Sequence, residues 1–243
     1  MERPGLALIM GGEGNLAQAI GAELASCGYR WRGLSRRQCD VTSIAAVGNA
    51  IERYGPQFIV NCAGITGIDR CARNSSKAHA VNGEGAGIIA SMAKHCNIGM
   101  VHVSCSDVLF GSNVRANNKI GTRLPDSVYG RSKLFGEQLV RLINPPECLI
   151  VRTRWREGSG CIGCIPTFEF SGAYSERSML MNSDSDSPPY ISDIASTIVE
   201  LIATGETGTF DAIHSANYEP MSTSHMASRE IVEMLIALKR AGA

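Results

Sequence analysis

The sequence of 243 residues has no excess of either charge and no long apolar run. Its 23 Lys and Arg residues balance 23 Asp and Glu residues, so no electrostatic footprint for a nucleic acid or a membrane surface is visible. No stretch reaches the roughly 18 apolar residues of a membrane span, and Gly5 to Met10 is too short for the core of a signal peptide. We therefore expect a cytoplasmic protein that binds neither nucleic acid nor membrane.

The cysteines lack the pattern of a disulfide framework or a zinc site. There are 9 of them, an odd number, scattered along the chain and several inside apolar runs, which favours reduced core residues. Cys161 and Cys164 form the one tight pair. A structural zinc ion would need a second pair, and none exists, so we expect no bound metal.

Short apolar runs alternate with amphipathic segments over the first 150 residues. Four runs are nearly continuous in apolarity, as strands buried on both faces of a parallel sheet should be: 6–10, 58–60, 100–103 and 148–151. Between them, apolar residues recur every three or four positions, which indicates helices. This alternation predicts the α/β class, a doubly wound parallel sheet of the Rossmann type.

The pattern changes after Arg152. Residues 156–190 are rich in Gly, Ser, Asp and Pro and predict loops and short strands. Two helices, at 192–204 and about 224–239, and a strand at 208–214 follow. We divide the chain into a cofactor-binding Rossmann domain, 1–155, and a small C-terminal substrate lobe, 156–243, interleaved with the last sheet elements.

A glycine loop follows the first predicted strand and opens a helix. Gly11 permits the tight turn, Gly14 lets a phosphate approach the backbone, and the small Ala17 lets the helix pack closely on the strand. The free N–H groups at Asn15 and Leu16 then face the phosphate. The context of strand, loop and helix predicts a dinucleotide site.

The end of the second strand, near 29–34, favours NADP(H). An NAD site usually has an acidic ribose ligand here, but no acidic residue lies between Glu23 and Asp40. Ser35 and Arg36 stand there instead, followed by Arg37, and a guanidinium matches a 2′-phosphate in charge and geometry. NAD(H) stays open, because exposed loop arginines are common.

Tyr129 and Lys133 lie four residues apart at the start of a predicted helix, so both project from one face. An ammonium beside a phenol favours the phenolate, and we expect Lys133 to lower the pKa of Tyr129 toward the working range. Upstream, the segment 104–107 supplies hydroxyls at the carboxyl edge of the sheet, where α/β proteins bind ligands.

With these motifs the sequence resembles the extended short-chain dehydrogenase/reductase superfamily, and within it the dTDP-4-dehydrorhamnose reductases. The matching elements are the glycine loop, 40–42, 61–64, 81–82, Ser106 with Asp107, Tyr129 to Glu137, and Arg152 to Trp155. The resemblance covers residues 5 to about 155 well and is loose through 182–204.

The resemblance implies an NADPH-dependent reductase of the 4-keto group of a nucleotide-linked 6-deoxysugar, with a homodimer as a further expectation. It makes Ser106, Tyr129 and Lys133 catalytic, with Ser106 hydrogen-bonded to the reacting oxygen. It places Thr66, Ser106, Asp107 and Trp155 on the substrate. The expected cofactor-binding residues are Gly11, Gly14, Asn15, Leu16, Ser35, Arg36, Asp40, Val41, Cys62, Ala63, Gly64, Tyr129 and Lys133. Two alternatives stay open: a nucleotide-sugar epimerase or dehydratase, and a non-catalytic regulatory subunit that keeps the cofactor.

Overall fold

The computed structural model describes residues 5–108, 125–153, 166–169, 176–181 and 190–214. The strands are β1 (Leu6–Met10), β2 (Arg30–Leu34), β3 (Phe58–Asn61), β4 (Gly99–Cys105), β5 (Cys148–Thr153), β6 (Pro166–Glu169), β7 (Glu176–Met181) and β8 (Gly208–His214). The helices are α1 (Asn15–Ser26), α2 (Ile44–Tyr54), α3 (Ile68–Arg73), α4 (Ser75–His79), α5 (Gly85–His95), α6 (Val128–Ile143) and α7 (Ile191–Ala203). A π-helical turn, η1 (Ala80–Glu84), precedes α5, and a 3-10 turn, η2 (Ser106–Val108), follows β4.

All described strands join one sheet in the order β2-β1-β3-β4-β5-β8-β7-β6. Every neighbouring pair is parallel except β6 with β7. The chain leaves β1 toward β2 on one side and returns to β3 on the other. The strand order therefore reverses between β1 and β3, at the kind of position where α/β sheets bind ligands.

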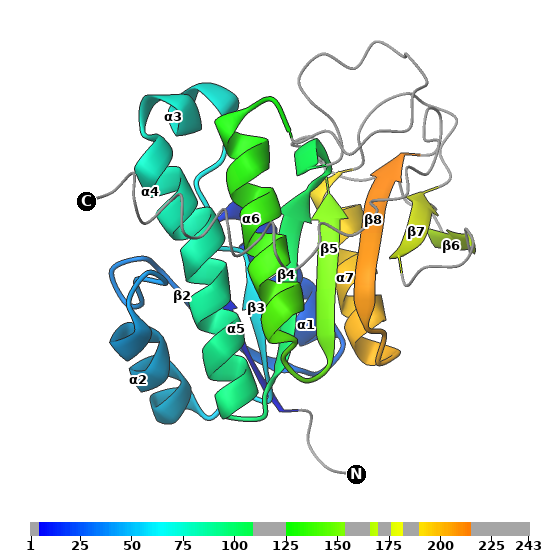
Figure 1. Ribbon diagram of the computed structural model, residues 1–243. Helices are drawn as coiled ribbons and strands as arrows, with labels where there is room; N and C mark the ends of the chain where they lie inside the picture. Colours follow the sequence, from blue (N-terminus) through cyan, green and yellow to red (C-terminus); the bar gives the residue numbers. More distant parts are fainter. Residues whose placement is uncertain (1–4, 109–124, 154–165, 170–175, 182–189, 215–243) are drawn as a thin grey trace.

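Helices cover both faces of the sheet, which confirms the predicted doubly wound α/β fold (Figure 1). Apolar side chains of α1 and α7 pack on one face, against alternate residues of the strands such as Val101, Val151 and Phe210. Helices α2, α5 and α6 lie together on the opposite side of the ribbon, and this face buries Met100 and Ile150. Two apolar layers thus fix the strands whose ends carry the site.

The elements beyond β5 match the sequence predictions as far as they are described. The helix expected at 192–204 is α7, and the strand expected at 208–214 is β8. Residues 156–190 contribute the short strands β6 and β7. The helix expected at 224–239, together with Trp155, Cys161 and Cys164, lies outside the described residues. Within the described ranges, no helix has the length and apolar character needed to cross a membrane.

Candidate active site

The glycine turn between β1 and α1 is tight and open on its outer side. Gly11 has a φ of +74°, a conformation that L side chains rarely adopt. A Cβ on Gly12 would lie 2.4 Å from the Cα of Gly33, so glycine is required for this contact with β2. A Cβ on Gly14 would meet only the Gly11 carbonyl, at 3.3 Å, and Gly14 offers no side chain to cap α1. A phosphate group fits this cradle at the positive end of the helix.

The end of β2 lies beside this turn, because the Gly12 N–H donates to the Leu34 carbonyl at 2.9 Å. Arg36 is exposed there, and its Nε lies 3.4 Å from Oδ2 of Asp40. The other Asp40 oxygen accepts hydrogen bonds from the backbone and the hydroxyl of Thr42, which hold the pKa of Asp40 below its usual value. The structure thus brings the predicted Arg36 and Asp40 together next to the cradle, with Ser35 and Val41 buried beside them.

The segment after β3 joins the glycine turn to Lys133. Oδ1 of Asn61 accepts from the Ala63 N–H at 3.1 Å and fixes the turn into 62–64. A Cβ on Gly11 would lie 2.8 Å from the Ala63 backbone, so the two turns touch. On the other side, a Cβ on Gly64 would lie 4.0 Å from Nζ of Lys133. The predicted cofactor residues therefore form one continuous strip along the carboxyl ends of β1, β2 and β3.

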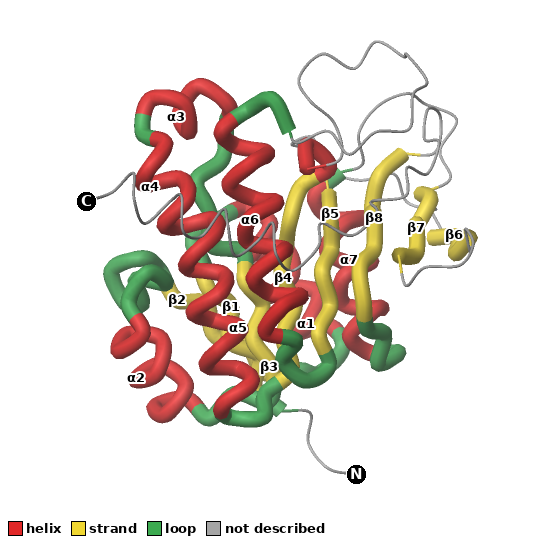
Figure 2. The backbone as a smooth tube through the Cα atoms, in the orientation of Figure 1, coloured by secondary structure: helices red, strands yellow, loops and turns green. Residues whose placement is uncertain are grey.

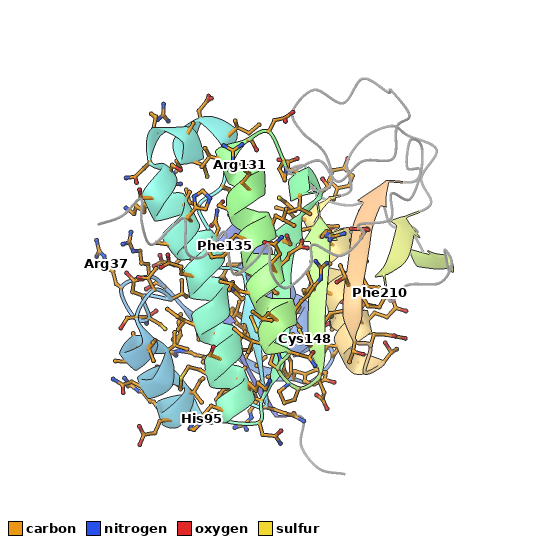
Figure 3. The ribbon with its side chains drawn as sticks, viewed as in Figure 1. Arg37, His95, Arg131, Phe135, Cys148 and Phe210 are labelled. Atoms are coloured by element: carbon orange, nitrogen blue, oxygen red, sulfur yellow. The ribbon has the colours of Figure 1, made fainter. Side chains whose placement is uncertain are left out.

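Helix α6 presents Tyr129 and Lys133 to this strip. Ser127 caps the helix by accepting the Gly130 N–H at 2.9 Å. A Cβ on Gly130 would lie 2.8 Å from the Asp107 carbonyl oxygen, so glycine lets the first turn of α6 lie against η2. Ser106, buried in η2, thereby lies next to the helix that carries Tyr129. Figure 3 shows Arg131 at this end of α6, and Cys148 and His95 at the opposite end of the molecule.

The electrostatics of Tyr129 differ from the expectation. Burial raises the pKa of the Tyr129 phenol well above its ordinary value, and Cys105, which accepts a hydrogen bond from the phenol, and Asp107 raise it further. Nζ of Lys133 donates instead to the Val103 carbonyl at 2.6 Å. The prediction that Lys133 lowers the Tyr129 pKa is therefore wrong for this structure, because burial and the neighbouring Cys105 and Asp107 raise it. Tyr129 is kept as the neutral phenol, the form that can donate a proton.

Asn82 is a site residue that the sequence reasoning did not select. It is buried in η1, where its Oδ1 accepts from the Ile65 N–H at 2.7 Å and its Nδ2 donates to the Ile65 carbonyl at 2.9 Å. Nδ2 also donates to the hydroxyl of Ser132, which in turn donates to the Tyr129 carbonyl at 2.8 Å. Asn82 therefore ties the loop before Thr66 to the first turn of α6. The signal was the pair Val81–Asn82, but a π-helical turn cannot be predicted from a 3.6-residue period.

The structure describes two of the other predicted substrate residues, Thr66 and Asp107. Thr66 is exposed on the loop that Asn82 holds, and Asp107 is half-buried in η2. Within the described ranges, no group of three or more His, Cys, Asp or Glu side chains could hold a metal ion.

Three thiols surround Lys133, and their protonation leads to a testable prediction. Burial raises the pKa of Cys62 to about 12 and that of Cys105 to about 11, and it also raises the pKa of Cys71. Because the thiolate is the nucleophile, we expect iodoacetamide at neutral pH to label these cysteines at least about tenfold more slowly than the exposed Cys27 and Cys96. Peptide mass spectrometry measures the rates, and urea-unfolded protein is the control. Equal labelling of Cys105 and Cys27 in the folded protein would contradict the prediction.

Known proteins are similar to this chain in sequence and in fold. A dTDP-4-dehydrorhamnose reductase of Mycobacterium tuberculosis is 31% identical over 216 residues, covering 86% of this chain and 69% of that protein. A dTDP-4-keto-6-deoxy-D-glucose reductase of Streptomyces niveus is 30% identical, covering 84% of this chain and 70% of that protein. The crystal structure of dTDP-4-dehydrorhamnose reductase from Yersinia enterocolitica superimposes with a TM-score of 0.66 at 26% identity, covering 87% of this chain and 75% of that one.

A family model matches nearly the whole chain, well beyond the separate sequence motifs. The family described as RmlD substrate binding domain matches residues 6–240, which include every site residue discussed above. The chain therefore belongs to the RmlD substrate binding domain family.

Proposed function

We propose that this protein is an NADPH-dependent reductase of the 4-keto group of a nucleotide-linked 6-deoxysugar. The observation that carries the proposal is the placement of the acid Tyr129, with Lys133 and Ser106, beside an open glycine cradle at the carboxyl edge of one sheet. The relatives named as reductases of dTDP-linked keto sugars support the substrate class.

Each site residue has a separate role in the proposed reaction, according to its position. NADPH, when bound, supplies the hydride. The glycine turn and the N-terminus of α1 bind its phosphates, and Lys133 binds its nicotinamide ribose. Tyr129, held neutral by burial, donates its proton to the sugar oxygen at C4. Ser106 donates a hydrogen bond to the same oxygen, which stabilises the negative charge that develops there.

The direct test is oxidation of NADPH by the purified protein in the presence of dTDP-4-keto-6-deoxyhexose. We expect one NADPH to be consumed for each sugar reduced, followed by absorbance and by product chromatography. An epimerase or dehydratase would convert a sugar nucleotide with no net consumption of NADPH, because its cofactor is regenerated. A regulatory subunit would bind the cofactor but would neither oxidise NADPH nor convert the sugar nucleotide.

Arg36 is expected to set the preference for NADPH over NADH. Because its guanidinium is exposed and also contacts Asp40, we expect Arg36→Ala to reduce the preference by only about 1 kcal/mol, roughly fivefold. Titration of both cofactors by fluorescence measures it. Arg53→Ala, which removes the same charge from α2, should leave the preference unchanged. Equal affinity of the unmutated protein for NADPH and NADH would contradict this assignment.

Three expectations about the setting of the reaction stay predictions. They are action in the cytoplasm, assembly as a homodimer, and division into a cofactor half, 1–155, and a substrate half, 156–243. Cell fractionation tests the first, and light scattering of the purified protein tests the second. Trp155 also stays a predicted substrate contact, which Trp155→Ala would test through the KM for the sugar nucleotide.

A further inference from the structure

One face of α6 carries a row of four polar residues. Tyr129, Lys133, Glu137 and Arg141 follow one another at steps of four, so they lie above one another on the same side of the helix. The reaction proposed above uses the first two. The row continues from the candidate site into the interface between α6 and the sheet, where the next residue, Glu137, is completely buried.

Glu137 makes close contacts with two guanidinium groups. Nε of Arg152, on β5, donates to both Glu137 carboxylate oxygens at 3.0 and 3.1 Å, and Nη2 of Arg152 donates to Oε2 at 2.9 Å. Nη2 of Arg141 lies 3.1 Å from the same Oε2. Burial alone would raise the pKa of Glu137, but Arg152 and Arg141 lower it to about 2. Glu137 is therefore a carboxylate at neutral pH.

Stability alone does not account for this arrangement. Removing a carboxylate and a guanidinium from water costs several kcal/mol for each ion, and a well-packed apolar pair of the same size is often as stable. Among the described residues, Glu137 contacts the cations Arg141 and Arg152, and Lys133 lies one turn away on the same face of α6. Loss of the Glu137 charge would remove the carboxylate that both guanidinium groups contact.

The groups that face Lys133 come from several elements. They are Cys62 after β3, Cys71 on α3, Cys105 and His102 on β4, and Glu137 on α6. The thiols are protonated, and burial lowers the pKa of His102 to about 3, so that His102 is neutral. Of these groups, Glu137 is the negative charge at neutral pH. Its charge raises the pKa of Lys133 and so opposes the effect of burial, which lowers it.

We propose that Glu137 is a positioning residue that keeps the buried Lys133 ammonium charged and, through Arg152, fixes the position of α6 on the sheet at which Tyr129 meets the substrate and Lys133 meets the cofactor. The catalytic part of this inference rests on the proposed function. The electrostatic part concerns Lys133 alone and does not need a substrate.

The test is Glu137→Gln, which keeps the shape and removes the charge. Because a cation is less stable without its neighbouring anion, we expect the pKa of Lys133 to fall by about one unit or more. The alkaline limb of the rate profile should move to lower pH by the same amount, while at more acidic pH the rate should return to within a few-fold of the unmutated protein. The pKa is measured from the Lys133 Nζ resonance of 15N-lysine-labelled protein, assigned with Lys133→Met.

Two variants separate positioning from a merely structural role. Glu137→Asp keeps the charge, so the limb should stay near its original pH even though the protein loses stability. Asp211→Asn removes a carboxylate from the other side of Arg152, where Oδ1 lies 3.5 Å from Nη1, and should destabilise the protein without moving the limb.

A further variant covers the case in which Glu137→Gln does not fold. The double variant Glu137→Met with Arg152→Met replaces the Glu137–Arg152 pair with apolar side chains, so that neither member of this pair is left buried without the other. The pKa of Lys133 should again fall. An unchanged Lys133 pKa in either folded variant would overturn the inference. If the unmutated protein fails to oxidise NADPH with any keto sugar, the proposed function is wrong, but the resonance still reports on Glu137.

Discussion

Tyr129→Phe should reduce the turnover of a keto-sugar nucleotide by about 100-fold or more and leave the affinity for NADPH nearly unchanged. The phenol is held neutral by burial and by its hydrogen bond to Cys105, so it can act as the proton donor. Its hydroxyl contributes mainly in the transition state, and general acid catalysis typically accounts for two or more powers of ten. Steady-state assays give the turnover, and fluorescence titration gives the affinity.

Two further variants show whether a loss of turnover in Tyr129→Phe comes from loss of the proton donor. Tyr54→Phe removes a phenol hydroxyl from α2, away from the site, and should keep the full rate. Lys133→Met should reduce both turnover and cofactor affinity, because one ammonium serves the ribose and the site of proton transfer. If Tyr129→Phe keeps the full rate, the proton comes from another residue. A protein with no turnover but normal cofactor binding would favour the regulatory subunit.

Arg152→Met should destabilise the folded protein by about 3–5 kcal/mol at neutral pH. Arg152 is completely buried between Glu137 and Asp211, so its loss leaves two buried carboxylates without their shared partner. Breaking a buried ion pair by removing one member typically has an effect of this size. Urea unfolding of the cofactor-free protein measures it, with Arg53→Met on the exposed end of α2 as a control expected within about 0.5 kcal/mol of the unmutated protein.

The deficit of Arg152→Met should shrink as the pH falls. In the unmutated protein the pKa of Glu137 is about 2, below the ordinary value of about 4.3 for an unfolded chain. Its stabilising contribution is therefore complete above about pH 4.3 and is lost as the pH falls through about 2. Without Arg152 the buried carboxyl takes up a proton at higher pH, which relieves its burial penalty near pH 4. An equal deficit at neutral pH and near pH 4 would show that lost packing, not charge, causes it.

The sequence predicts the strands and the glycine turn well, because both depend on local pattern. The run 6–10 is apolar throughout and becomes the fully parallel-paired β1, and the glycines that follow are required by backbone contacts at the turn. The step of four between Tyr129 and Lys133 places both on one face of any helix. These features need no knowledge of distant residues.

The chemistry of the site depends on contacts that no local pattern encodes. Asn82 acts through Ser132, 50 residues away, and from within a π-helical turn. Lys133 donates to a carbonyl on β4, and burial raises the pKa of Tyr129. Arg152 stood in a motif of the sequence, but its partner Glu137 is visible only once α6 packs on β5. Long-range packing therefore decides the protonation states.

The position of β8 has a consequence for the folding of the chain during its synthesis on the ribosome. Figure 2 shows β8 beside β5, and the strand pairs with β5 on one side and β7 on the other. A nascent chain that ends at residue 155 would expose β5 as an open edge, with Leu149 and Val151 uncovered by α7. We expect such a fragment to aggregate. We therefore expect residues 1–155 to complete their sheet only after residue 214 has left the exit tunnel, when most of the chain has been synthesised.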